Sequence, residues 1–147
     1  MATRSTIAVL NPNGTVSQIY CHWDGYLEWN GRILVENYNT LERVQELIAL
    51  GDLNSLHENI HSTTDSHTFE DPEPNVGVYY GRDRGESGVE PRVYDSLEDY
   101  IENFQREEFN YLFQAGEWTY TEDSTGSVFR SVKDDLNNLQ SDRDEDE

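Results

Sequence analysis

Near its start, the 147-residue chain carries an Asn-Gly pair between two short runs of residues that favour β-strands. The runs are Thr6 to Leu10 and Thr15 to Cys21, and Asn13-Gly14 lies between them. This arrangement is the strongest short-range signal for a β-hairpin, because both turn residues tolerate the positive φ angles that a tight hairpin turn needs. The chain is therefore expected to open with two antiparallel strands, around which the rest of the fold is built.

Two capped helices and a second hairpin are expected further along the chain. Asn39-Thr40-Leu41-Glu42 can form a capping box before apolar residues at helical spacing, and Gly51 ends that helix. Ser96 is expected to cap a second helix, whose apolar residues recur at helical spacing up to Phe104. Other patterns predict helices at 31–38 and at 52–60, a strand at 76–80, and a second hairpin at 109–121. A C-terminal helix is expected from the spacing of its apolar residues, Val128, Val132, Leu136 and Leu139.

This order of elements predicts an α+β fold. We expect a single domain over residues 1–140, with a mainly antiparallel sheet of about four to five strands and about three to four helices packed on one face of it. Nine Tyr, five Phe and three Trp provide enough large apolar groups for one core. Residues 141–147 carry no apolar side chain and are expected to form a disordered acidic tail.

The charge of the chain is unbalanced, because thirty acidic residues stand against ten basic ones and give a net charge of −20. Such a chain repels nucleic acid and anionic lipid, so we expect neither direct nucleic-acid binding nor membrane association. It attracts basic protein surfaces, including those that hold DNA or RNA. Nine of the ten basic residues are arginine, and the acidity could instead reflect adaptation of a whole proteome to salt.

The cysteine content and the apolar runs bear on location. Cys21 is the single cysteine, which excludes an intramolecular disulfide and favours a reducing compartment. The longest apolar runs, about four residues, are too short for a signal peptide or a membrane span. A soluble, cytoplasmic protein is therefore expected.

Acidic residues are densest around the second capped helix. At spacings of three and four residues, carboxylates on a helix form a row with about 5–6 Å between neighbours. This resembles the row of phosphates along one DNA strand, so such a face could occupy a basic groove by mimicking DNA. The alternative is an acidic face that is merely solvated. The predicted acidic face consists of Asp95, Glu98, Asp99, Glu102, Glu107 and Glu108.

Two segments combine residue types suited to a small ligand. Residues 21–26, Cys-His-Trp-Asp-Gly-Tyr, offer a titratable pair and flat rings for stacking, although they could equally form a structural corner. Residues 79–85 place arginines suited to phosphate in a Gly-rich stretch, although each arginine could simply pair with a neighbouring acid. Whether the two segments share one site stays open. The candidate ligand-binding residues are His22, Trp23, Asp24, Tyr26, Tyr79, Arg82 and Arg84.

A third segment matches the zinc-hydrolase pattern, in which two histidines share one helical face with a glutamate base. His57, Glu58 and His61 fit this pattern, and His67 lies at the spacing of a third ligand. Thr64 stands where the extended pattern needs glycine, and the surrounding residues are polar. We therefore predict no metal, no cofactor and no catalytic residue, with the three histidines as weak metal candidates.

The motif at residues 21–26 resembles one in a family of small proteins from bacteriophages and mobile elements. The resemblance runs with gaps from about residue 3 to residue 118 and includes residues 31–38, 47–56 and 81–86. Leu27 departs from it, because the family usually has proline at this place. The resemblance implies an accessory phage protein, the kind often devoted to disarming host defences, and it brings no reaction with it.

These features favour a non-enzymatic inhibitor of a host defence system, of anti-CRISPR or anti-restriction type. It would bind the basic surface of a host protein or nucleoprotein complex through its acidic, nucleic-acid-mimicking face. Two alternatives stay open. One is a protein that binds and sequesters a nucleotide signal, and the other is a small metal-dependent hydrolase.

Overall fold

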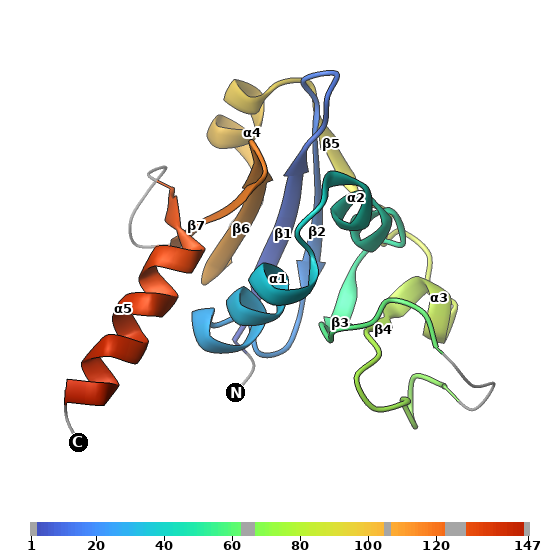
Figure 1. Ribbon diagram of the computed structural model, residues 1–147. Coiled ribbons are helices and arrows are strands. Elements are labelled where there is room, and N and C mark those ends of the chain that lie inside the picture. Colours follow the sequence, from blue (N-terminus) through green and yellow to red (C-terminus); the bar gives the residue numbers. More distant parts are fainter. Residues whose placement is uncertain (1–2, 63–66, 105–106, 123–128, 146–147) are drawn as a thin grey trace.

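The computed structural model describes residues 3–62, 67–104, 107–122 and 129–145, and it shows one mixed sheet flanked by helices (Figure 1). The strands are β1 (Ser5–Leu10), β2 (Val16–Cys21), β3 (Leu53–Ser55), β4 (Val78–Tyr79), β5 (Arg92–Tyr94), β6 (Phe109–Gln114), β7 (Glu117–Glu122) and β8 (Arg130–Ser131). They form an eight-stranded sheet in the order β4-β3-β2-β1-β6-β7-β8, with β5 also paired to β2. The helices are the π-helical turn η1 (Leu27–Gly31), α1 (Arg32–Asn37), α2 (Leu41–Ala49), α3 (Tyr80–Arg84), α4 (Leu97–Asn103) and α5 (Val132–Glu145).

Both predicted hairpins are confirmed. β1 and β2 pair antiparallel with Leu10 opposite Val16, and Gly14 in their turn adopts a φ angle of +91°. β6 and β7 pair antiparallel around Ala115 and Gly116, which also have positive φ angles. β1 pairs with β6 in parallel, so the two hairpins lie side by side at the centre of the sheet.

The two capped helices are also confirmed. The cap of α2 is Thr40, one residue later than the expected capping box places it, because its hydroxyl accepts a hydrogen bond from the Arg43 N–H at 3.2 Å. Ser96 caps α4 in the same way, accepting from the Asp99 N–H at 3.0 Å. Gly51 ends α2 with a φ angle of +90°, a left-handed conformation that glycine adopts without strain.

The α+β class is confirmed, but the sheet is larger than the expected four to five strands and contains the parallel pairs β1–β6 and β2–β3. The unexpected strands β3, β5 and β8 have only two or three residues, too few to show the alternation by which a sequence reveals a strand. The helix expected at 52–60 is wrong. Leu53 there is fully buried and pairs with Cys21, so tertiary packing overrides the local helical pattern.

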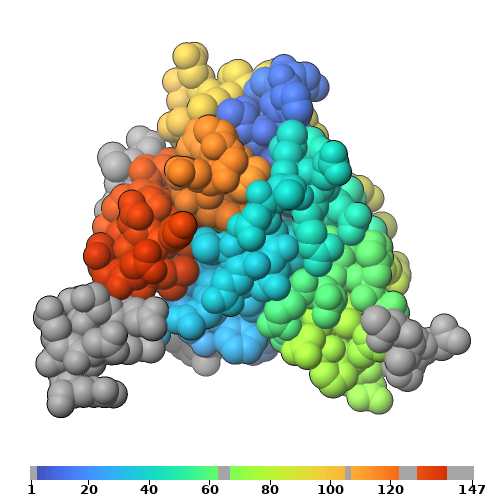
Figure 2. Space-filling model, in the orientation of Figure 1, coloured from blue at the N-terminus to red at the C-terminus, as the bar shows by residue number. Residues whose placement is uncertain are grey.

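Helices cover both faces of the sheet, so the expectation that they lie on one face is wrong. Leu34 of α1, Leu47 of α2 and Val132 of α5 belong to the main core on one face, where these helices cover the strands (Figure 2). On the other face, Tyr100 of α4 packs in a smaller cluster that includes Leu112 of β6. The second layer exists because the apolar side of α4 needs its own apolar partners on the sheet.

The C-terminal helix α5 runs to Glu145, so the backbone of residues 141–145 is helical where the sequence suggests a disordered tail. Residues 146 and 147 lie outside the described residues, and the division into a domain and a mobile tail stays a prediction. In the described ranges, none of the helices is both long enough and apolar enough to cross a membrane.

Candidate functional site

The Cys-His-Trp-Asp-Gly-Tyr motif forms a corner between β2 and η1, from which aromatic side chains project into solvent. Trp23 and Tyr26 are 42% and 39% exposed. Asp24 has a φ angle of +56°, and a β-carbon on Gly25 would lie only 2.6 Å from Cβ of Ser5. The backbone of this corner is therefore closely packed, although its rings are exposed.

Buried polar groups hold the corner from inside. The side-chain amide of Asn30 donates hydrogen bonds to Ser5 Oγ at 3.2 Å and to Cys21 Sγ at 3.5 Å. The hydroxyl of Tyr111 donates to the carbonyl oxygen of Gly25 at 2.7 Å. Desolvation by burial raises the pKa of Cys21 to about 12, so its thiol is protonated at neutral pH.

The motif's side chains point to different parts of the surface. The rings of His22 and Trp23 meet edge to face, with their centroids 4.8 Å apart. Nδ1 of His22 also lies 2.7 Å from the hydroxyl of Tyr20. Tyr26 instead lines a cavity of about 380 Å³ beside Arg130. The candidate ligand residues of this motif are thus divided between two regions.

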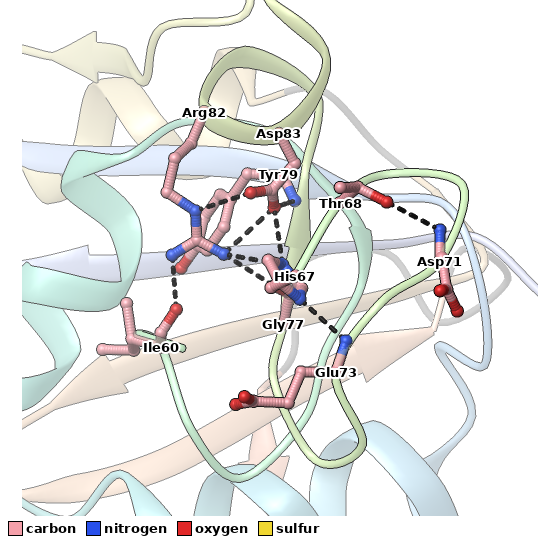
Figure 3. A network of polar contacts seen from close by, with 9 residues as sticks. All are labelled: Ile60, His67, Thr68, Asp71, Glu73, Gly77, Tyr79, Arg82 and Asp83. Atoms are coloured by element: carbon pink, nitrogen blue, oxygen red, sulfur yellow. Dashed lines mark hydrogen bonds and ion pairs between the residues drawn. The ribbon is translucent and has the colours of Figure 1, made fainter. Parts of the chain in front are cut away.

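Arg82 lies at the centre of an internal polar network (Figure 3). Its guanidinium donates to both carboxylate oxygens of Asp83, at 2.9 and 3.0 Å. It also donates to the carbonyl oxygens of Gly77, at 2.9 Å, and Ile60. These contacts tie the segment after β3 to α3, and they leave Arg82 little capacity to bind a phosphate.

Tyr79 and Arg84, the other two candidate ligand residues of this segment, differ in exposure. Tyr79 is fully buried, and its hydroxyl donates to the carbonyl oxygen of Leu47 at 2.8 Å. Arg84 is exposed, with its nearest acidic partner, Glu86, at 3.8 Å. Tyr79 is buried, and Arg82, although exposed, uses its donors in internal contacts. Of the three candidate ligand residues in this segment, Arg84 is therefore the one best able to bind a ligand.

His67 completes the network in a defined protonation pattern. Its Nδ1 accepts a hydrogen bond from the Glu73 N–H at 2.9 Å, so the proton of the neutral ring is on Nε2. Nε2 lies 3.3 Å from the carboxylate of Asp83, and both side chains are almost fully buried. Desolvation by burial raises the pKa of Asp83. The opposing effects are larger, so the pKa is lowered overall; they are hydrogen bonds from Arg82, the Tyr79 N–H and His67, and the charge of Arg82.

Replacing Asp83 with asparagine is expected to cost most stability at neutral pH and progressively less below about pH 4. The pKa of Asp83 is lower in the folded than in the unfolded protein. Its contribution is therefore complete above the unfolded pKa and is lost as the pH falls through the folded pKa. Urea unfolding of both proteins between about pH 3 and pH 7 measures this difference. Glu36→Gln, at an exposed position on α1, is the control and should differ little from the wild type at any pH. A pH-independent loss for Asp83→Asn would contradict the prediction.

The two candidate ligand segments are separated by one strand, because β3 lies between β2 and β4. Asn54 of β3 links them. Its carbonyl oxygen accepts from the Trp23 N–H at 3.0 Å, and its side-chain amide donates to the hydroxyl of Tyr80 at 3.1 Å. Tyr80 is therefore the residue of the second segment that approaches the motif. Strand alternation could have identified it, since a buried Tyr79 implies that Tyr80 faces the other way.

The zinc-hydrolase interpretation loses its geometric basis, because residues 56–61 contain no helix that would align the histidines. His57 contacts the ring of Trp29, and burial lowers its pKa. His61 lies 3.3 Å from Glu46, and His67 belongs to the Arg82 network. Among the residues that the structure describes, no group of three or more His, Cys, Asp or Glu side chains could hold a metal ion.

The predicted acidic face is shorter than expected. Asp95, Glu98 and Glu102 are exposed on α4 or just before it, and Glu108 is exposed directly before β6; we call these four residues the acidic face from here on. Asp99 instead serves the helix cap, because its carboxylate accepts from the Asp95 N–H at 3.2 Å. Glu107 is only partly exposed.

Ion pairs neutralise other parts of the molecule. In the described part of the chain, arginines pair with Glu46, Asp52, Asp83, Glu86 and Asp135, none of which belongs to the acidic face. Exposed acids also occur on the other side of the sheet, for example Glu36 of α1 and Glu42 of α2. The surplus of carboxylates is thus spread over the molecule, and around α4 it is not offset by ion pairs within the described residues.

No family model matches this chain, and neither a curated protein nor a solved structure is significantly similar to it. The likeness to bacteriophage proteins therefore stays a prediction. Function has to be inferred from the chemistry of the surface.

Proposed function

We propose that the protein is a non-enzymatic inhibitor encoded by a bacteriophage or mobile element. Its acidic face would occupy a basic, nucleic-acid-binding surface of a cytoplasmic host defence complex, such as a CRISPR effector or a restriction enzyme. The observation that carries this proposal is the unpaired state of the acidic face within the described residues. Neighbouring like charges repel one another, and a cationic partner relieves this repulsion.

The packing of α4 against the sheet supports a binding role. Tyr100 and Phe104, on the apolar side of the helix, are 0% and 6% exposed and anchor it to the sheet. Glu98 and Glu102 are four residues apart and lie on the same side of the helix, about 5–6 Å from one another. Carboxylates on a fixed helix lose less conformational entropy on binding than carboxylates on a flexible segment.

Glu98 and Glu102, with Asp95 just before the helix, would form a short row that compares with a few consecutive phosphates of one DNA strand. Such a face should accelerate encounter with a basic groove and exclude the nucleic acid that normally occupies it. The interaction should also weaken steeply with salt, since charges are screened over about 10 Å at 0.1 M ionic strength. The hydrolase alternative has less support, because the histidines on which it depends point into separate contacts.

Reversing two charges on α4 is expected to weaken inhibition by at least about tenfold, because close interfacial charge pairs carry much of such an interaction. The test variant is Glu98→Lys with Glu102→Lys. It is measured as plating efficiency of a phage on bacteria that carry a CRISPR or restriction system and express the protein. Competition with DNA for the purified defence complex, at about 50 mM and 300 mM salt, gives the same comparison in vitro.

The matched control is Glu36→Lys with Glu42→Lys, which changes the net charge equally on the other side of the sheet. Glu42 occupies the same position after its helix cap as Glu98 does, so both variants perturb a helix start alike. The control should inhibit as the wild type does. Equal behaviour of the two double variants, or binding that does not respond to salt, would refute the proposal.

A further inference from the structure

A cluster of aromatic and polar side chains lies on the sheet face that carries α4, at the end that α4 does not cover. We propose that this cluster is a binding site for a nucleoside monophosphate, separate from the acidic face. We call it the aromatic sheet face, and it consists of Tyr20, His22, Asn54 and Tyr80.

The pairing of the strands places these side chains together. Cys21, Leu53 and Tyr79 are register neighbours on β2, β3 and β4, and all three are fully buried in the main core. Successive side chains of a strand point to opposite faces, so the residues next to them point away from that core. α4 packs on the same side but near Val16, at the other end of β2. The aromatic sheet face is accordingly half-buried rather than covered.

The rings of this cluster offer flat surfaces for a base. The centroids of Tyr20 and His22 are 6.0 Å apart, and Trp23 meets His22 edge to face. On the other side of Asn54, the ring centroid of Tyr80 lies 5.7 Å from that of Phe69. Planar bases stack on such rings, and each stacked base contributes about 1–3 kcal/mol in proteins that bind single strands.

Polar atoms of the cluster can recognise the edge of a base. Asn54 donates through its amide nitrogen to the hydroxyl of Tyr80, which leaves the hydroxyl proton available to a ligand. Across the described ranges, neither the carbonyl oxygen of the Asn54 side chain nor Nε2 of His22 has a hydrogen-bond partner. The Asn54 side-chain oxygen can therefore accept a hydrogen bond, the Tyr80 hydroxyl can donate one, and Nε2 of His22 offers a third polar atom. This mixture suits the polar edge of a nucleobase.

Arg4 provides the charge complement for a phosphate. Ser5 lies opposite Cys21, so Arg4, one residue earlier, lies on the face of His22. Burial raises the pKa of Tyr20 and the charge of Arg4 lowers it, which agrees with their proximity. Arg4 is exposed and forms no ion pair with the described residues. A guanidinium without an ion pair, beside aromatic rings, suits an anion such as phosphate, whose oxygens accept its hydrogen bonds.

The remaining charges restrict the size of that anion. Glu107 also acts on Tyr20, and the whole chain carries a net charge of −20. Both disfavour a polynucleotide, whose many phosphates would be repelled. A nucleoside monophosphate combines the base that the rings stack with the single phosphate that Arg4 can hold.

Titration of the purified full chain with AMP, GMP, CMP and UMP tests this site, with tyrosine and tryptophan fluorescence and the melting temperature as readouts. At least one nucleotide should bind with a Kd below about 1 mM.

Arg4→Gln should weaken that binding by about tenfold, because it removes a charge-assisted hydrogen bond. Arg32→Gln is the matched control, an exposed arginine on α1 at the other face, and should leave the Kd unchanged. His22→Ala should weaken binding without lowering the melting temperature of the free protein by more than a few degrees.

Several outcomes would overturn the proposal: no binding of any of the four nucleotides, equal binding of inorganic phosphate alone, tighter binding of an oligonucleotide, or equal affinities of Arg4→Gln and Arg32→Gln. The Glu98→Lys, Glu102→Lys variant should bind the nucleotide within about twofold of the wild type, since screened surface charges act weakly at a distance. Loss of inhibition with retained nucleotide binding, or the reverse, would therefore separate this site from the proposed inhibitory function.

Discussion

Replacing Gly51 with alanine is expected to lower the free energy of unfolding by about 3–5 kcal/mol. Gly51 has a φ angle of +90°, and a β-carbon there would overlap the carbonyl oxygen of Val89. That oxygen accepts a hydrogen bond from the Asp52 N–H at 2.9 Å, so it cannot retreat without breaking the bond. The variant thus combines backbone strain with a steric overlap between α2 and the segment before β5. Urea unfolding of wild type and variant measures the loss.

Gly14 provides a matched control for this experiment. Its φ angle of +91° is almost the same as that of Gly51, but a β-carbon there would have no atom within 4 Å. Gly14→Ala should therefore cost only the backbone strain, about 1–2 kcal/mol. If the two alanine variants lose equal stability, the close approach of Val89 contributes nothing and the prediction is wrong.

Replacing Arg82 with methionine is expected to cost about 3–4 kcal/mol of folding free energy. The side chain of Asp83 is only 6% exposed, and without Arg82 its charge would lose its principal partner. The carbonyl oxygens of Gly77 and Ile60 would also lose a donor. Methionine keeps most of the apolar stem of arginine, so the change isolates the polar contacts. Urea unfolding at neutral pH measures the difference.

Arg84→Met is the matched comparison, because Arg84 lies two residues further along the same helix and is exposed, with its nearest acidic partner, Glu86, 3.8 Å away. It should change the stability by no more than about 0.5 kcal/mol. Arg82→Lys keeps the charge but not the planar fork, and its stability should lie between the other two. An Arg82→Met protein as stable as Arg84→Met would show that the network is unimportant.

The elements that the sequence predicts well are those with complete local signals. The two central hairpins have both turn residues and flanking strand patterns, and α2 has a cap, an apolar stripe and a glycine stop. The order of strands depends instead on contacts between distant segments, such as the pairing of β1 with β6, for which a single sequence has no local signal. The helix expected at 52–60, on which the zinc-hydrolase pattern depends, is absent for the same reason, since Leu53 pairs with the distant Cys21 in the sheet.

The candidate sites show the same division. Arginine beside glycine suggested a phosphate site, but Arg82 is used internally because carbonyl oxygens and a carboxylate from three other residues surround it. Asp99 does not belong to the acidic face, because its carboxylate accepts a hydrogen bond from the Asp95 N–H at the start of α4. Tyr20 and Tyr80 were missed, since their neighbourhood arises only when β2, β3 and β4 assemble.

The parallel pairing of β1 with β6 has a consequence for biosynthesis. Residues 11–108 are synthesised between the two partner strands, Ser5–Leu10 and Phe109–Gln114. One edge of the nascent first hairpin therefore stays open to other strands until this intervening segment has been made. Such long-range pairing slows completion of the sheet, and repulsion between the many carboxylates of the chain opposes aggregation during this interval.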